Sequence, residues 1–129
     1  MHILVVDDVA VVRELMSMVA GSAFEGATVH TAENLAGALA MAHTMPSLDL
    51  VLLDLGLPDS DGLETLRAFR GAFPRAKVVV VSSNDDDAIV ENALGAGAQG
   101  FMSKSLKTPA MFAALRTVAG GAVYKPLRL

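Results

Sequence analysis

The chain has 129 residues, 53% hydrophobic and 19% charged, so it is long enough for one domain with a buried core and too apolar for a disordered segment. Its formal net charge of −4 argues against a surface that binds nucleic acid or an anionic membrane, because such surfaces are basic. The absence of cysteine excludes disulfides and thiolate metal sites.

Short apolar runs alternate with stretches of helical length along the chain. The apolar runs are mostly continuous, as expected for parallel strands covered on both faces. They occupy residues 2–6, 27–31, 50–54, 77–82 and 99–103, and the helical stretches occupy roughly 9–21, 33–45, 61–71, 86–96 and 108–119. Five consecutive β–α units predict an α/β fold with a single doubly wound, five-stranded parallel sheet.

Residues at the ends of the helical stretches are typical start and stop signals. Thr108 is predicted to cap a helix that has Pro109 at its first position, and Asp61 is a second candidate cap. Glycines are predicted to end four of the helices: Gly21, Gly71, the pair Gly95 and Gly97, and the pair Gly120 and Gly121.

The last helical stretch, AMFAALRTVAG, contains Arg116 as its only charge. Either its small alanines tolerate water, or part of this helix meets a second subunit, as in a homodimer, or a missing domain. The tail AVYKPLRL contains Pro126 and has little periodicity. We therefore expect a domain over residues 1–120 and the start of a linker, or a C-terminal tail, over 121–129.

Neither a signal peptide nor a membrane span is indicated. The N-terminal MHILVVDD lacks a basic segment, and its apolar run is short. Longer apolar stretches are interrupted by charge or glycine before they reach spanning length. We expect a cytoplasmic protein without membrane contacts.

Polar residues follow four of the five strands at their carboxyl ends, where doubly wound sheets bind ligands. These residues are Asp7 and Asp8 after the first strand, Asp54 after the third, Ser82 and Ser83 at the fourth, and Lys104 after the fifth. Taken singly, each aspartate or serine is a common helix cap and the lysine is a common surface residue. Taken together, the carboxylates repel one another by roughly 1–4 kcal/mol per pair at about 4 Å, which a divalent cation relieves. Oxygen ligands without histidine or cysteine favour Mg²⁺.

Such a cluster is suited to phosphoryl transfer. A carboxylate such as Asp54 can act as a nucleophile and form an aspartyl phosphate. Mg²⁺ and the Lys104 ammonium group would neutralise the phosphoryl oxygens, and a serine hydroxyl would donate a hydrogen bond to one of them.

In these features the whole chain resembles a response-regulator receiver domain. Asp7 and Asp8 resemble the acidic pair of the family's metal site. In DLGLPDSDG, Asp54 falls at the phosphoacceptor, and Pro58 and Gly62 fall at the family's proline and glycine. Ser82 matches the switch hydroxyl, Phe101 the switch aromatic residue and Lys104 the phosphate-pairing lysine. The resemblance implies a flavodoxin-like (βα)5 fold with strand order 2-1-3-4-5.

The resemblance also implies roles for individual residues. Asp8 and Asp54 would bind Mg²⁺ by their side chains, Gly56 by its backbone carbonyl, and Asp7 through water. A sensor histidine kinase would phosphorylate Asp54, and the chain would catalyse only its own phosphorylation and dephosphorylation. Ser82 would then move toward the phosphoryl group and Phe101 would turn inward.

The sequence departs from the family in three places. Ser83 stands where a small residue, often alanine, is usual, and it should be tolerated. Ser105 follows Lys104 where many receivers have proline, so we expect a trans peptide bond there. The run 84–87, NDDD, adds negative charge beside the site. It is either a solvated helix N-terminus or, at Asn84, a residue that affects how water attacks the phosphoryl group.

Two segments resemble receivers that precede a LuxR-type helix-turn-helix domain: the pattern VVxxSSN and the final GGAVYKP. This resemblance predicts a transcriptional output. DNA binding is then expected only from an absent output domain, and not from this chain.

Three other functions are compatible with part of this pattern. A phosphohydrolase of the haloacid-dehalogenase type needs a second aspartate two positions after the nucleophile, where this chain has Gly56. A nucleotide- or flavin-binding protein is disfavoured because neither G-x-x-x-x-G-K-[ST] nor G-x-G-x-x-G after the first strand is present. A degenerate receiver that acts as a phosphorylation-independent interaction module stays open, although all the polar positions of the site are filled.

Overall fold

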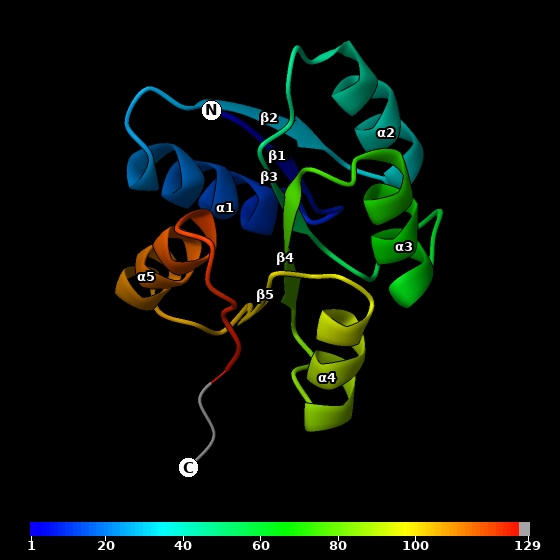
Figure 1. Cartoon of the computed structure of the whole chain (residues 1–129), viewed down its shortest axis with the longest axis vertical. Coiled ribbons are helices and arrows are strands. Elements are labelled where there is room, and N and C mark those ends of the chain that lie inside the picture. Colours follow the sequence, from blue (N-terminus) through cyan, green and yellow to red (C-terminus); the bar gives the residue numbers. More distant parts are fainter. Residues whose placement is uncertain (127–129) are drawn as a thin grey trace.

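The computed structural model describes residues 1–126 and has a central parallel sheet with helices on both faces (Figure 1). Its strands are β1 (His2–Val6), β2 (Thr28–Ala32), β3 (Leu50–Leu53), β4 (Lys77–Ser82) and β5 (Gly100–Ser103). They pair in the order β2-β1-β3-β4-β5, and every pair is parallel. The predicted five-stranded, flavodoxin-like α/β fold is therefore confirmed, together with its strand order.

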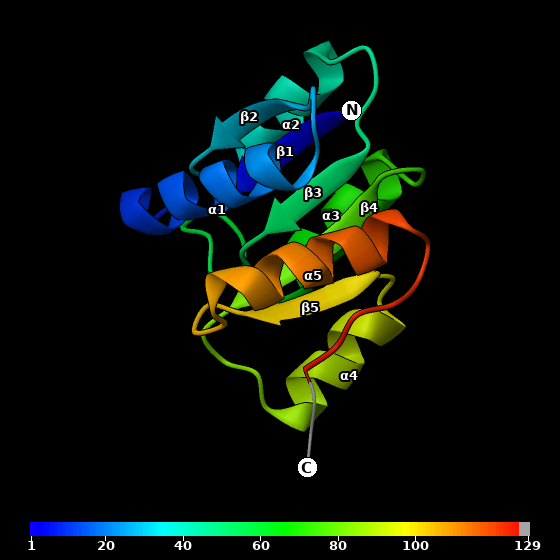
Figure 2. The ribbon, with the colours of Figure 1, turned by 90° about the vertical axis from the view of Figure 1, so that its left-hand side faces the viewer.

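The helices cover both faces of the sheet (Figures 1 and 2). They are α1 (Ala10–Ala23), α2 (Leu35–Thr44), α3 (Leu63–Ala72), α4 (Asp87–Gly95) and α5 (Thr108–Ala119). Helices α1 and α5 enclose one hydrophobic core against the sheet, and α2, α3 and α4 enclose the other.

Strand β1 shows why the apolar runs are continuous. Leu4 and Val6 belong to the core under α2, α3 and α4, whereas Ile3 and Val5 belong to the core under α1 and α5. All four side chains are at most 1% exposed. Successive side chains of the strand point to opposite faces of the sheet, and both faces are buried. Apolar residues are therefore needed at every position of the strand.

The predicted helix starts at Thr108 and Asp61 are wrong in detail. Lys107 is the N-cap residue of α5, so Thr108 is the first residue of the helix. The N-cap of α3 is Gly62, which has φ of 49°, a conformation that glycine adopts without a steric penalty. Asp61 contributes only its backbone carbonyl, which accepts a hydrogen bond from the N–H of Glu64.

The predicted glycine stops are correct for two helices and wrong for the other two. Gly95 is the last residue of α4 and Gly120 is the C-cap of α5. Gly21 and Gly71, however, lie inside α1 and α3, which continue to Ala23 and Ala72. Helix packing overrides the weak preference against glycine at these positions, which lie within the last turn.

Helix α5 buries most of its large apolar side chains, and Phe112 is half-buried. Met111, Ala114, Leu115 and Val118 are at most 1% exposed. Of the residues on the opposite side, Ala113 and Arg116 are exposed. The interpretation in which small alanines face water therefore accounts for the apolar sequence of this helix, without requiring a partner.

The chain after α5 returns to the sheet. Tyr124 forms an isolated parallel bridge with Gly100 of β5. Residues 127–129 of the predicted linker lie outside the described residues, and the boundary of the domain at residue 120 stays a prediction. Within residues 1–126, every helix is too short or too polar to cross a bilayer.

Candidate functional site

The site lies where β1 and β3, neighbours at the centre of the sheet, reach their carboxyl ends. The N–H of Asp7 donates to the carbonyl of Ala32, and the N–H of Asp54 donates to the carbonyl of Val6. These bonds continue the parallel ladders one residue beyond the strands. Asp7 and Asp54 are therefore fixed in the sheet by their backbones, as expected at the ligand-binding edge of a doubly wound fold.

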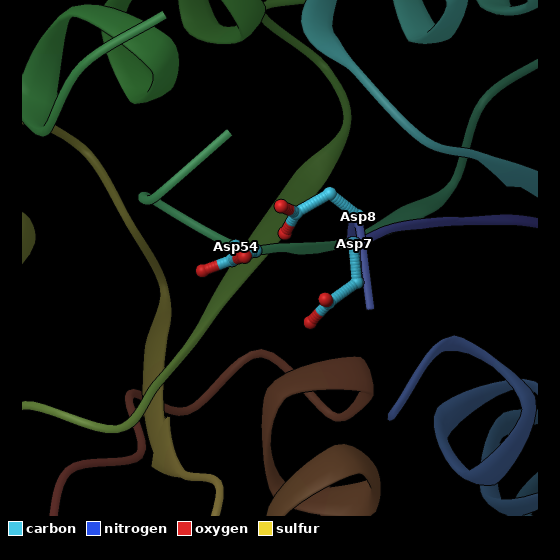
Figure 3. A group of neighbouring side chains, drawn as sticks. All are labelled: Asp7, Asp8 and Asp54. Carbon is cyan, nitrogen blue, oxygen red and sulfur yellow. The ribbon is translucent and has the colours of Figure 1, made fainter. Parts of the chain in front are cut away.

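The three predicted carboxylates come together (Figure 3). Asp7, Asp8 and Asp54 each offer a carboxylate oxygen within 4.8 Å of the others. Asp7 and Asp54 are buried, with exposed fractions of 2% and 6%, whereas Asp8 is exposed. The two neighbours Asp7 and Asp8 direct their side chains to opposite sides, because successive residues alternate in extended backbone (Figure 3).

Lys104 brings its ammonium group to the two buried carboxylates. Its Nζ lies 3.1 Å from Oδ2 of Asp7 and 3.4 Å from Oδ2 of Asp54. The backbone supports this placement, since the N–H of Lys104 donates to the carbonyl of Ser82. The peptide bond between Lys104 and Ser105 is trans, as expected.

Asp7 is held on several sides. Its Oδ1 accepts a 2.9 Å hydrogen bond from the N–H of Val9, while its Oδ2 faces Lys104. Its carbonyl accepts a 2.8 Å hydrogen bond from Nη1 of Arg13, whose other nitrogen lies 3.7 Å from the carboxylate of Glu33. Both carboxylate oxygens of Asp7 are thus engaged within the protein.

The environment of Asp54 disfavours its charged form. Burial raises the pKa of its carboxyl group, and the neighbouring Asp7 carboxylate adds to the rise. A 3.1 Å hydrogen bond from the N–H of Gly56 to Oδ1 and the positive charge of Lys104 lower the pKa, but only in part offset the effect of burial. Additional positive charge at this site would therefore stabilise the ionised carboxylate.

The donor set fits Mg²⁺. It consists of carboxylate oxygens, which are hard ligands, and the side chain of Asp8 makes no hydrogen bond or ion pair with any residue in the described part of the chain. Its carboxylate is thus available to a cation beside the Oδ1 of Asp54. The predicted ligands Asp8, Asp54 and the carbonyl of Gly56 remain predictions, as does the water-mediated role of Asp7.

The predicted switch residues lie on adjacent strands. Ser82 is half-buried and its Oγ accepts a 3.1 Å hydrogen bond from the N–H of Asn84. Both residues line a cleft of about 310 Å³ between the loop after β3 and helix α4. Phe101 is fully buried in the core on the α4 side of the sheet.

Asp86 and Asp87 stand at the N-terminus of α4 and are exposed, which favours the solvated helix N-terminus for this acidic run.

Two polar residues of this region were missed in the sequence. Arg13 braces the backbone of Asp7, and Asp59 accepts hydrogen bonds of 2.7 and 2.9 Å from the N–H groups of Leu35 and Ala36. The Asp59 carboxylate thereby joins the loop after β3 to the N-terminus of α2. No local pattern indicates these contacts, because their partners are distant in the sequence or on another element.

Comparison with known proteins agrees with this geometry. Residues 3–116 match the response regulator receiver domain family. The glycerol metabolism activator of Pseudomonas putida is 36% identical over 124 residues, which cover 96% of this chain and 56% of that protein. The oxygen regulatory protein NreC of Staphylococcus aureus is 30% identical over 131 residues, covering 100% of this chain and 59% of NreC. The chain thus spans less than two thirds of the length of these relatives.

Solved structures show the same likeness. A LuxR family DNA-binding response regulator from Silicibacter pomeroyi superimposes with a TM-score of 0.84 at 28% identity, over 97% of this chain and 96% of that one. A response regulator from Burkholderia pseudomallei with a phosphorylated aspartic acid, a calcium ion and citrate gives a TM-score of 0.77 at 25% identity, over 92% and 68%. The chain belongs to the response regulator receiver domain family.

Proposed function

We propose that Asp54 accepts a phosphoryl group from a sensor histidine kinase in a Mg²⁺-dependent reaction. The observation that carries this assignment is the position of Asp54, a buried carboxylate at a strand end. It lies 3.4 Å from the Lys104 ammonium group and within reach of two further carboxylates. A structural ion pair alone would not require the exposed and unpaired carboxylate of Asp8 beside it.

The transfer forms one bond and breaks one. A carboxylate oxygen of Asp54 attacks the phosphorus atom, and the bond from phosphorus to the donor, a phosphohistidine nitrogen or the oxygen of a small acyl phosphate, breaks. Lys104 is placed to pair with a phosphoryl oxygen, and the hydroxyl of Ser82 to donate a hydrogen bond to another. Mg²⁺ held by Asp8, Asp54 and the carbonyl of Gly56, with Asp7 acting through water, would neutralise the charge that gathers on the phosphoryl oxygens.

The reaction has a conformational readout. The ring of Phe101 is already fully buried in this structure, and the space that Ser82 leaves when it moves toward the phosphoryl group would further accommodate it. Phosphorylation therefore favours the buried position of Phe101 and the surface of α4, β5 and α5 that accompanies it. Water acts as the later acceptor of the phosphoryl group, and Asn84 at the edge of the cleft is placed to affect its approach.

The output is transcriptional in this scheme. Two of the relatives, which are longer than this chain, are a transcriptional activator and a transcriptional regulatory protein. A similar solved structure is described as a LuxR family DNA-binding response regulator. With its net charge of −4, this chain is not itself the DNA-binding part. Self-association through α5 is a separate prediction, tested by the solution mass with and without the phosphoryl mimic beryllofluoride.

Incubation with acetyl phosphate tests the function. In the presence of Mg²⁺ the chain should gain one base-labile phosphoryl group, and chelation of Mg²⁺ should abolish the gain. A folded chain that stays unmodified under both conditions would instead be a degenerate receiver that works without phosphorylation.

A further inference from the structure

The segment after α5 is paired to the open edge of the sheet. The N–H of Phe101 donates a 2.9 Å hydrogen bond to the carbonyl of Tyr124, and the N–H of Tyr124 donates a 3.0 Å bond to the carbonyl of Gln99. Together they make the parallel bridge between Tyr124 and Gly100. Tyr124 thus supplies partners to a strand edge that would otherwise be unpaired at this point.

Contacts on both sides hold this segment in place. Gly121 reverses the chain with φ of 98°, and the N–H of Ala122 donates to the carbonyl of Thr117 in α5. Tyr124 packs against the core under α1 and α5. Nζ of Lys125 lies 3.5 Å from the carboxylate of Glu91 in α4. The segment therefore links α5, β5 and α4, as its course across β5 toward α4 shows (Figure 2).

Strand β5 also contacts the proposed phosphorylation site. Ser82 pairs in register with Ser103 of β5, and the carbonyl of Ser82 accepts the N–H of Lys104. The backbone N–H of Phe101 binds the carbonyl of Tyr124, whereas the Phe101 ring lies in the core under α2, α3 and α4, on the other face of the sheet from Tyr124. One end of β5 is thus in contact with the phosphorylation site, and its edge is in contact with the segment.

We propose that residues 122–126 form an allosteric strand whose docking on β5 and α4 is stabilised by phosphorylation of Asp54. The coupling rests on the proposed function and runs through β5, whose backbone binds Tyr124 at Phe101 and whose end places Lys104 beside Asp54. By linkage, docking of the segment must strengthen the phosphorylated state by the same factor. Phosphorylation would then hold any domain attached beyond the segment more firmly in place relative to the receiver domain.

The composition of the chain gives a direct probe. Tyr124 is the only tyrosine and the chain has no tryptophan, so tyrosine emission reports this segment alone. Beryllofluoride with Mg²⁺ should reduce quenching of that emission by acrylamide, with the same midpoint as beryllofluoride binding measured by calorimetry. Asp54→Asn should show no change. Unchanged quenching in a chain that binds beryllofluoride would overturn the coupling and leave the proposed function intact.

A matched pair of prolines tests the reciprocal effect. Tyr124→Pro removes the N–H that binds Gln99, whereas Val123→Pro removes an N–H that binds nothing in residues 1–126. Tyr124→Pro should weaken beryllofluoride binding about fivefold, and Val123→Pro should leave it unchanged. Lys125→Glu should act in the same direction as Tyr124→Pro, and adding Glu91→Lys should restore binding. Wild-type affinity in both Tyr124→Pro and Lys125→Glu would overturn the coupling. A wild-type chain that does not bind beryllofluoride would overturn the proposed function as well.

Discussion

Lys104 and Asp7 form the shortest ion pair of the site, with Nζ of Lys104 3.1 Å from Oδ2 of Asp7 and 3.4 Å from Oδ2 of Asp54. One cation thus serves two buried carboxylates that come from different strands. Because both carboxylates are nearly inaccessible to water, their repulsion is screened mainly by this lysine. The lysine holds the metal-free site together and is already positioned for a phosphoryl group.

Replacement of Lys104 should therefore destabilise the metal-free chain. Lys104→Met leaves two buried carboxylates without a cation, and we expect the free energy of unfolding to fall by about 1–3 kcal/mol in EDTA. Mg²⁺ should restore part of the loss. Urea unfolding with and without Mg²⁺ measures both effects, and Lys107→Met, at an exposed neighbour, is the control. Equal stability of Lys104→Met and wild type in EDTA would contradict the assigned role.

Asp54→Asn should have the opposite effect on stability. Because burial raises the pKa of Asp54 in the folded chain, the protonated carboxyl group favours folding at low pH, and this contribution to stability is lost as the pH rises through the folded-state pKa. At neutral pH in EDTA, Asp54→Asn should therefore be more stable than wild type, by about 0.5–2 kcal/mol. The difference should shrink when the pH falls below about 4, where the carboxyl group is protonated in both states. A variant less stable than wild type at neutral pH would show that pairing with Lys104 outweighs burial.

Asp59 should stabilise the fold in a pH-dependent way. Hydrogen bonds from Ala36 and Leu35 lower the pKa of its carboxyl group in the folded chain. Its contribution is therefore present above the unfolded pKa, near 3.8, and is lost as the pH falls through the lower folded-state value. Asp59→Asn should melt at a lower temperature than wild type at pH 7 and converge with it in acid. Asp61→Asn, in the same loop, should melt like wild type at both pH values.

Arg13 should act on the metal site through Asp7. Its hydrogen bond to the Asp7 carbonyl fixes the backbone from which Asp7 and Asp8 project. Arg13→Gln should weaken Mg²⁺ binding by about tenfold, as expected when a residue that supports ligands is lost. Calorimetric titration with Mg²⁺ measures the effect, with Arg67→Gln on the exposed side of α3 as the control. Equal Mg²⁺ affinities of Arg13→Gln and Arg67→Gln would contradict a role for Arg13 at the metal site.

The sequence predicts the parts of this structure that depend on local pattern. Continuous apolar runs identify the strands, and the strand ends identify Asp7, Asp54 and Lys104, because parallel strands place their carboxyl ends at one edge. Helix ends are predicted less well. Asp61 is a preferred capping residue, but a glycine at 62 with positive φ takes the N-cap position instead.

Local sequence patterns do not predict contacts between segments that are distant in the chain. Asp59 caps α2, which precedes it by more than 20 residues, and Tyr124 pairs with β5 although its segment looks like a linker. In both cases a single residue makes the contact, so no periodicity marks it. The apolar sequence of α5 is compatible with exposed alanines or with a partner, and only the packing in three dimensions shows that Met111, Leu115 and Val118 are the side chains that the core buries.

The identity of the residue that reacts is the central claim, and intact-protein mass measurement tests it most directly. Wild type, Asp54→Asn and the loop control Asp61→Asn would be incubated with acetyl phosphate and Mg²⁺, and their thermal melts recorded to establish folding. Wild type and Asp61→Asn should each gain one base-labile phosphoryl group, and Asp54→Asn should gain none. A phosphoryl group retained on folded Asp54→Asn at the wild-type level would contradict the assignment.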